Sequence, residues 1–442
     1  MKYSLTGLTD SALRHLPVLL QKKAEVASAR ARVTDARHAF LPTSYLGDEL
    51  IAATDNSIPG SYLSFGVIPS SSAGVRSSNN YQAALGNIAF LSNQYELVNF
   101  GLKKATVRNA EAFGNLSQAD LDRETYLVKW QVGKLYLEIL KMEYQLGIDR
   151  ENVGRYEKIF TVIQAVTQSG IKPGADSALA KAELSKTRTT YNQTYGQMRQ
   201  LQQQLSFLTG IAPDRLVIDT TRGRLNMMQP DEGAMGADTA GAAAANANPL
   251  LDYYQKQKSL YQRNEELVKK SFLPKILLTG IAWARGSGIN YQDHYESGLT
   301  GWGYQRFNYM GGLTIQYNLF NGVHRKDKEA IVHNDVLAND YSLQQQTLAL
   351  QNIGNKADEG IRTAVKNLRE IPIQVHAAED AYNQKTAQYK AGIINLVDLT
   401  NASFVLYRSQ SDYVQTLSDW LTASLDKAAA AGELDQFIQS IK

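Results

Sequence analysis

The chain has 442 residues, with 46 Lys or Arg against 43 Asp or Glu, which leaves a formal net charge of +3. This balance offers no electrostatic basis for nucleic-acid binding. The absence of cysteine excludes disulfides, thiolate metal sites and cysteine nucleophiles. No apolar run reaches the ~18 residues of a transmembrane helix, whereas a transmembrane strand needs only about ten alternating residues and is compatible with the sequence.

The N-terminal part of the chain predicts a helix followed by two strands. Residues 1–8 contain no apolar core of the length found in secretory signals, so we expect no signal peptide in this chain. The strands are expected at about 43–53 and 85–97, on either side of a loop rich in Ser, Gly, Asn and Pro.

The proline-free region that follows predicts a long helix over about 100–168, then a turn and a second helix over about 175–209. Six apolar residues of the long helix are spaced alternately by four and three positions, which is the a/d seam of a coiled coil. They are Val128, Val132, Leu135, Ile139, Met142 and Leu146. Such a helix has to pack against other long helices, so we expect antiparallel coiled-coil pairs. Residues 211–249 form a low-complexity, Ala- and Gly-rich equatorial linker.

The second half of the chain predicts the same series of elements. They are a helix from about residue 250, strands at about 275–285 and 308–319, a long helix over about 322–389 and a helix over about 396–431. Because proline disrupts a helix interior, we expect a kink or local break near Ile371–Pro372.

The two halves match in register, which indicates an internal repeat. Gly170, Asp176, Tyr191 and Gly210 correspond to Gly392, Asp398, Tyr413 and Gly432, each pair 222 positions apart (392 minus 170). A shared offset for all these residues favours duplication of a unit of about 220 residues. We therefore divide the chain into a first repeat (1–210), the linker (211–249), a second repeat (250–432) and a C-terminal tail (433–442).

The strand at 308–319 alternates between an apolar, aromatic side and a polar side. Such strands fit a transmembrane β-barrel, in which aromatic residues near the strand ends form a girdle. These aromatic residues are Trp283, Trp302, Tyr304, Phe307 and Tyr309. Four strands are too few to close a barrel, which needs about eight, so three copies of the chain are expected to supply twelve. The alternatives are a soluble coiled-coil scaffold that carries two hairpins and, less well matched, an adaptor-like periplasmic helical hairpin protein.

The sequence offers no catalytic, cofactor-binding or metal-binding residues. Its six histidines are scattered without the spacing of metal ligands, and neither a Gly-x-Ser-x-Gly elbow nor a phosphate-binding loop occurs. We therefore expect a protein that is not an enzyme and has no cofactor.

Several short motifs resemble those of the TolC-like outer-membrane efflux factor family. They are Phe40-Leu41-Pro42 before the first strand, Leu273-Pro274 before the third, Leu319-Phe320-Asn321-Gly322 after the fourth, and Tyr389, Gly392, Asp398 and Ala402 around the second turn. The resemblance covers nearly the whole chain. It implies a mainly α-helical membrane protein. Three copies would form a 12-stranded β-barrel in the outer membrane and an α-helical barrel of coiled-coil helices in the periplasm.

The resemblance also implies a transport function without catalysis. Such a homotrimer is an exit duct that exports small molecules, such as drugs or metals, as part of a tripartite efflux pump. A periplasmic adaptor (membrane fusion) protein and an inner-membrane transporter of the RND, ABC or MFS type would complete the pump, and outer-membrane lipid would surround the barrel. A type I secretion duct for polypeptides is the alternative within the same resemblance.

By the same resemblance, an iris-like gate closes the periplasmic tip. Asp176 corresponds to the tip aspartate, Tyr389 to the gating tyrosine and Asp398 to the first acidic ring. Two positions depart from the family: Ile394 stands where some members have a clamping Arg, and Asn401 where some have a second acidic ring. Three Asp398 carboxylates would favour cations in a narrow pore, while a helix N-cap is an equally open role for both aspartates. The turns expected to meet the adaptor include Gly170, Gly174, Gly392 and Leu396.

Overall fold

The computed structural model describes residues 2–56, 75–169, 174–219, 248–296 and 298–441. The chain forms two compact units. One contains Met1–Ala29, Ala112–Leu260 and Val336–Lys442, and the other contains Arg30–Glu111 and Tyr261–Asp335. Each unit takes segments from both halves of the sequence, so the units do not coincide with the two repeats into which we divide the chain.

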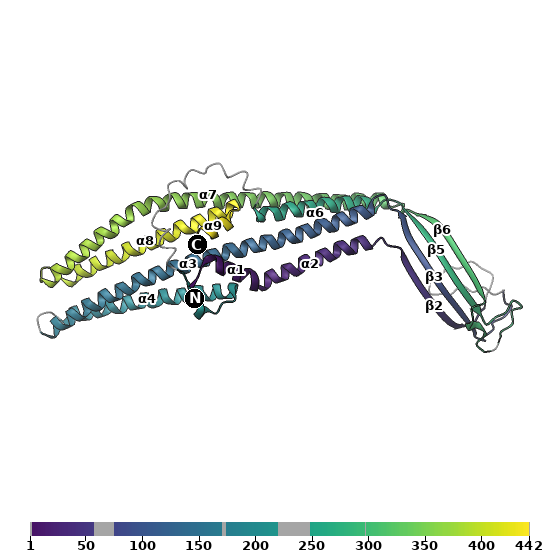
Figure 1. Ribbon diagram of the computed structural model, residues 1–442, viewed down its shortest axis with the longest axis horizontal. Helices are drawn as coiled ribbons and strands as arrows, with labels where there is room; N and C mark the ends of the chain where they lie inside the picture. The colour runs from purple at the N-terminus through teal and green to yellow at the C-terminus, as the bar shows by residue number, and fades with distance from the viewer. Residues whose placement is uncertain (1, 57–74, 170–173, 220–247, 297, 442) are drawn as a thin grey trace. The chain divides into compact units, whose positions relative to one another are not determined.

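Long helices and a single main sheet make up the structure (Figure 1). The helices are α1 (Leu5–His15), α2 (Pro17–His38), α3 (Leu102–Gln168), α4 (Gly174–Thr209), α6 (Pro249–Ser271), α7 (Asn321–Lys390), α8 (Leu396–Ala431) and α9 (Leu434–Ser440), with short 3-10 turns η1 (Pro213–Arg215) and η4 (Thr300–Trp302). The strands are β1 (Lys2–Tyr3), β2 (Thr43–Ala53), β3 (Ala84–Val98), β4 (Val217–Ile218), β5 (Lys275–Ser287) and β6 (Arg306–Gln316). No helix among the described residues has an apolar stretch long enough to cross a lipid bilayer.

The core of the first unit lies along the a/d seam of α3. Val132 and Ile139 are fully buried there, and Leu425 of α8 packs against them in the same cluster. The approach is close at Gly133, where an added Cβ would lie 3.1 Å from a methyl carbon of Leu425. A side-chain hydrogen bond also fixes the register of α3 and α8, because the Tyr126 hydroxyl donates to the Ala429 carbonyl at 2.7 Å. The expected coiled-coil packing of α3 is therefore present within this unit.

The long helix α7 continues without interruption through Pro372. A local break near Ile371–Pro372 is therefore absent, whereas the kink that we expected as the other possibility stays a prediction. Proline costs a helix interior about 3 kcal/mol, but Ile371 is buried and Leu368 packs on the core of this unit. Ala378 beyond the proline is also buried, so tertiary packing on both sides holds the helix together across the proline.

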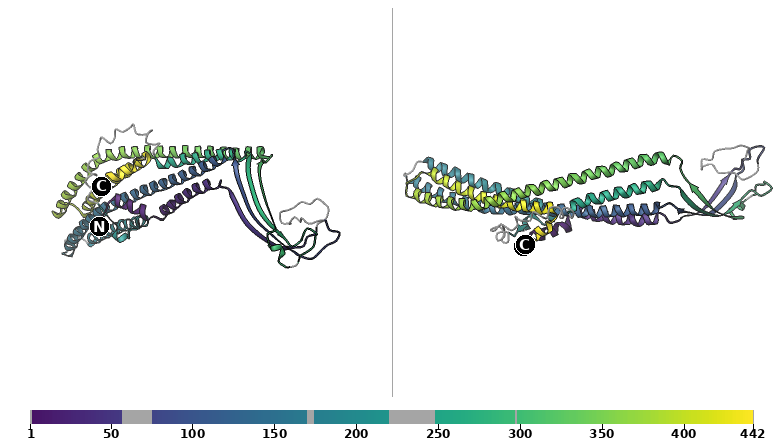
Figure 2. Two further views of the ribbon diagram at one scale, coloured as in Figure 1. Left: turned by 45° about the vertical axis from the view of Figure 1, so that its right-hand side comes forward. Right: turned by 90° about the horizontal axis from the view of Figure 1, so that it is seen from above.

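The second unit contains a four-stranded antiparallel sheet in the order β2-β3-β5-β6. The four strands lie side by side in one layer (Figure 2). Because side chains alternate along a strand, the register assigns every residue to one of two faces. The apolar face carries Leu46, Leu91, Leu278, Phe307, Tyr309, Leu313 and Ile315, and the polar face carries Thr43, Gln94, Glu96, Lys275, Thr279, Thr314 and Gln316. Among the described residues, β2 and β6 are each paired on one side only.

Candidate functional site

The turn between α7 and α8 is built by a glycine and an asparagine. Gly392 adopts φ 75°, which glycine reaches without strain, and the Ile393 N–H donates to the Gln388 carbonyl at 2.9 Å, closing the end of α7. Asn395 then caps α8, because its side-chain oxygen accepts the Asp398 N–H at 2.9 Å. Asn395, and not Asp398, is thus the N-cap of α8.

Asp176 and Asp398 occupy equivalent places in the first turns of α4 and α8. A carboxylate in the first turn interacts favourably with the backbone N–H groups at the helix N-terminus. Asp398 and Asn401 are exposed on α8, whereas Asp176 is half-buried. Gly174 begins α4 and is exposed, while the expected contact residue Gly170 lies outside the described residues.

A small apolar cluster joins the ends of four helices at this turn. It consists of Ile159 and Ile163 of α3, Ala180 of α4, and Leu396 and Leu399 of α8, with Tyr382, Tyr389 and Ile394 packed against it. Burial raises the pKa of the Tyr389 hydroxyl, and the neighbouring Asp176 carboxylate raises it further. Two of the residues that we expected at a gate, Asp176 and Tyr389, are therefore brought together, although they are more than 200 positions apart in sequence.

Leu396 does not belong to the accessible surface of the turn. Its side chain is 2% exposed within the apolar cluster, because it follows the N-cap and points back toward α3 and α4. The neighbouring residues Ile393 and Val397 are instead 72% and 51% exposed. Leu396, which we expected among the residues that meet an adaptor, is therefore buried, and the sequence analysis missed its two exposed neighbours.

A buried polar network between α3 and α8 was also missed. The Asp149 side chain is 2% exposed and accepts hydrogen bonds from Gln145 at 2.9 Å and from the Tyr407 hydroxyl at 3.0 Å. Gln145 also donates to Ser411 at 3.0 Å. Burial raises the pKa of Tyr407 to about 12, and the Asp149 carboxylate contributes to this rise. A sequence signal exists, because Asp149 follows Leu146 by three positions and so continues the a/d seam with a charged residue.

The five aromatic residues expected in one girdle do not share one face of the sheet. Phe307 and Tyr309 are 77% and 89% exposed on the apolar face. Trp283 pairs with Asn308 and Phe90, so its side chain lies on the polar face. Trp302 and Tyr304 come from the loop between β5 and β6 and not from a strand.

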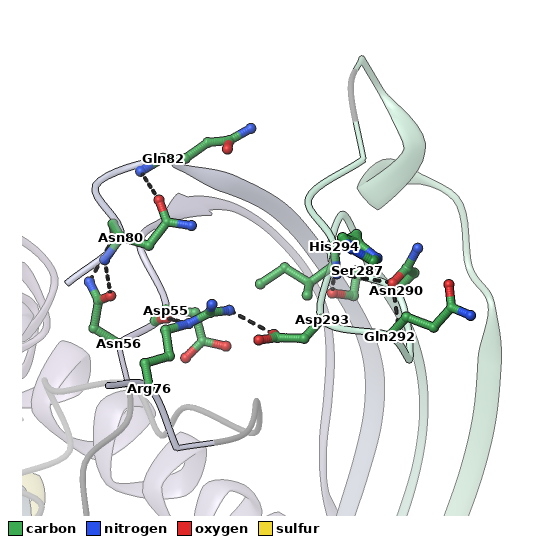
Figure 3. A network of polar contacts seen from close by, with 11 residues as sticks. Asp55, Asn56, Arg76, Asn80, Gln82, Ser287, Asn290, Gln292, Asp293 and His294 are labelled. Atoms are coloured by element: carbon green, nitrogen blue, oxygen red, sulfur yellow. Dashed lines mark hydrogen bonds and ion pairs between the residues drawn. The ribbon is translucent and has the colours of Figure 1, made fainter. Parts of the chain in front are cut away.

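An arginine links the two loops at the far end of the sheet (Figure 3). The Arg76 guanidinium lies 2.7 Å from an Asp293 carboxylate oxygen, donates to the Asp55 carbonyl at 2.6 Å, and lies 5.2 Å from the centre of the Tyr295 ring. The side chain of Asn290 organises the second loop by accepting N–H groups from the residues that follow it. The described residues contain no group of three or more His, Cys, Asp or Glu that could hold a metal ion.

Comparison of the sequence with models of protein families identifies the family of this chain. The model of the family described as outer membrane efflux protein matches residues 8–211 and 240–433. The chain belongs to this family. No curated protein sequence is significantly similar to it.

Solved structures of outer-membrane channels share the fold of this efflux protein. The outer-membrane channel OprN matches with a TM-score of 0.76 at 15% identity, over 97% of this chain and 90% of that chain. The CmeC channel of Campylobacter jejuni matches with a TM-score of 0.77 at 14% identity, over 99% and 89%. VceC of Vibrio cholerae gives 0.75 at 14% identity, over 97% and 96%. The resemblance to TolC-like channels is thereby confirmed.

Proposed function

We propose that the protein is the outer-membrane exit duct of a tripartite efflux pump and exports small molecules, such as drugs or metals, from the periplasm. Its membership in the outer membrane efflux protein family supports this role. The observation that carries the proposal further is the four-stranded sheet, which has one apolar face and two outer strands that are each paired on one side only among the described residues.

The functional assembly we propose is a homotrimer. Four strands cannot close a barrel, whereas three copies supply twelve if β2 of one copy pairs with β6 of the next. The apolar face would then meet lipid and the polar face would line a water-filled lumen. The repeated order α2-β2-β3-α3-α4 and α6-β5-β6-α7-α8 supports a duplicated unit, and its long helices would form an α-helical barrel in the periplasm.

The gate, in this proposal, lies at the turn between α7 and α8 and the start of α4. Three exposed Asp398 carboxylates around the axis would favour cations in a narrow pore. Tyr389 packs in the apolar cluster beside Asp176, so an iris-like opening has to separate this packing. Ile394 packs on the same cluster. The closed state would therefore be held by apolar contacts where some relatives have a clamping Arg.

The partners we propose are a periplasmic adaptor and an inner-membrane transporter of the RND, ABC or MFS type. The adaptor would meet the exposed turn around Gly392, where Ile393 and Val397 offer apolar side chains to a partner. The two aliphatic residues stand at the exposed start of α8, so a helical hairpin with apolar tips fits this surface.

Fractionation and bilayer recordings test the proposal. The protein should require detergent for extraction from the outer membrane and run as a heat-labile trimer, whereas a water-soluble rod would favour the scaffold alternative. Asp398→Ala should weaken block of the channel by multivalent cations in planar bilayers. Asp10→Ala, at an exposed position on α1, is the matched control and should leave the block unchanged. Equal block in both variants would remove Asp398 from the constriction.

A further inference from the structure

Two polar residues lie on the apolar face of the sheet near the β5–β6 loop. Asp48 of β2 pairs with Ala89, and Asn87 of β3 pairs with Gly286 of β5. The Asp48–Ala89 row continues across the sheet through Ala284 to Phe307, and the Asn87–Gly286 pair belongs to the next row of the same face. An unsatisfied carboxylate or amide on a lipid-facing surface is costly, because hydrocarbon offers no hydrogen-bond partners.

The loop of residues 299–305 returns onto this part of the apolar face. A Cβ added to Gly286 would point to the apolar face and would lie 2.0 Å from the carbonyl oxygen of Gly303. A Cβ added to Gly301 would lie 2.1 Å from the carbonyl oxygen of Leu85. Both distances are far below any real Cβ contact, so the loop and the strands touch backbone to backbone, and glycine permits that approach.

Two hydrogen bonds join this loop to the polar residues of the face. The Asn87 side chain is 7% exposed, and its Nδ2 donates to the Trp302 carbonyl at 2.8 Å. The Tyr304 hydroxyl donates to the Asp48 carboxylate at 2.9 Å. The backbone N–H of Gln305 donates to a β5 carbonyl at 2.7 Å and closes the loop. The loop therefore buries Asn87 and supplies one hydrogen-bond partner to each of the two polar residues, while Asp48 stays exposed.

We propose that the 299–305 loop forms the outer rim of the lipid-contacting surface and that its partner is outer-leaflet lipid at the boundary between headgroups and acyl chains. This inference rests on the proposed function, because it requires the apolar face to meet the bilayer. Trp302 and Tyr304 are 46% and 44% exposed on the loop. Each combines an apolar ring with a polar atom, and such residues concentrate at membrane–water interfaces. They extend the exposed aromatic surface of Phe307 and Tyr309 beyond the strand ends.

Depth-dependent fluorescence quenching tests the inference on the full-length trimer in phospholipid vesicles. The sequence contains four Trp, so a variant in which Trp130, Trp283 and Trp420 are replaced by Phe reports on Trp302 alone. Acyl chains brominated near the headgroup should quench Trp302 about twofold more strongly than chains brominated near the bilayer centre. Tyr304→Phe removes the bond to Asp48 and should lower the quenching. Tyr291→Phe, at a loop position that is 94% exposed, is the matched control and should leave it unchanged.

A second probe separates this inference from the proposed function. Leu313→Trp, placed on the apolar face in a background without other Trp, should be quenched by brominated lipid if that face meets the bilayer. Quenching of Leu313→Trp together with a Trp302 that responds only to aqueous iodide would overturn the loop inference and leave the duct in place. Quenching of neither residue would overturn both. Quenching of Trp302 that Tyr304→Phe leaves unchanged would overturn the role of the Asp48 bond in seating the loop.

Discussion

Replacing Glu143 by Gln should stabilise the helical unit above neutral pH and leave it unchanged in acid. Glu143 lies on α3, and burial raises its pKa from the ordinary 4.5 to about 7, against a smaller lowering by Lys2. Between pH 4.5 and about 7 the folded chain binds more protons at this site than the unfolded chain does. The stability contributed by the protonated acid is therefore complete below pH 4.5 and is lost as the pH rises to about 7.

The size of this effect follows from the two pKa values. A rise from 4.5 to about 7 corresponds to about 3 kcal/mol, at roughly 1.4 kcal/mol for each factor of ten. Because the Glu143 side chain is partly exposed, screening by water reduces the figure to about 1–2 kcal/mol. Gln keeps the shape of the side chain and has no charge to desolvate. The variant should then gain about 1–2 °C in Tm above pH 7, given an unfolding entropy of about 2 cal/mol/K per residue.

Scanning fluorimetry of the detergent-solubilised protein from pH 4.5 to 8 measures this difference. The quantity that matters is the Tm of Glu143→Gln minus the Tm of the wild type at each pH. Glu138→Gln, on the same helix at an exposed position, is the matched control and should give a constant difference. A constant difference for Glu143→Gln as well would refute the reasoning, since the carboxylate would then carry no desolvation cost.

Three further changes have defined outcomes. Tyr407→Phe leaves the buried carboxylate of α3 with one fewer donor and should cost about 1–3 kcal/mol in urea unfolding, whereas Tyr413→Phe on the same helix, the control, should cost less. Ile315→Asp on the apolar face should impair membrane assembly, measured as heat-labile trimer on gels, while Gln316→Asp on the polar face should be tolerated. The reverse result would mean that the facing of the strands is wrong. Arg76→Ala removes the ion pair between the two far loops and should speed their cleavage in limited proteolysis, so an unchanged rate would contradict a structural role for that pair.

Much of the fold could be predicted from the spacing of hydrophobic residues, because a long helix or strand repeats this spacing many times. The helix expected over about 100–168 is observed as Leu102–Gln168, and the strand expected at about 275–285 as Lys275–Ser287. Helix α7 is not broken at Pro372 because packing overrides the local preference for a break, and the kink expected there stays a prediction. Trp283 was assigned to the wrong face of the sheet. The composition near a strand end does not show which face a residue occupies, and a shift of one position moves a side chain to the opposite face.

The candidate site was less accessible to sequence reasoning. The approach of Tyr389 to Asp176 could be anticipated only through the family resemblance, because the two lie on different helices. The burial of Leu396 depends on which residue caps α8, and both Asn395 and Asp398 are chemically suited to that role. The return of the 299–305 loop depends in part on the close approach of Gly301 to the backbone of Leu85, more than 200 positions away in sequence. No local sequence pattern encodes such a contact.

The half-paired strands β2 and β6 also bear on biogenesis. In the trimer that we propose, a lone protomer would present the outer edges of β2 and β6, which have no further strand partner among the described residues, beside an apolar sheet. Such edges are where misassembly and aggregation begin. Sheet formation and subunit association should therefore be one concentration-dependent event, so that dilution lowers the apparent stability of the newly made protein. If the trimer forms as proposed, a cell that makes this chain needs either rapid encounter among its copies or a chaperone that shields both edge strands until they pair.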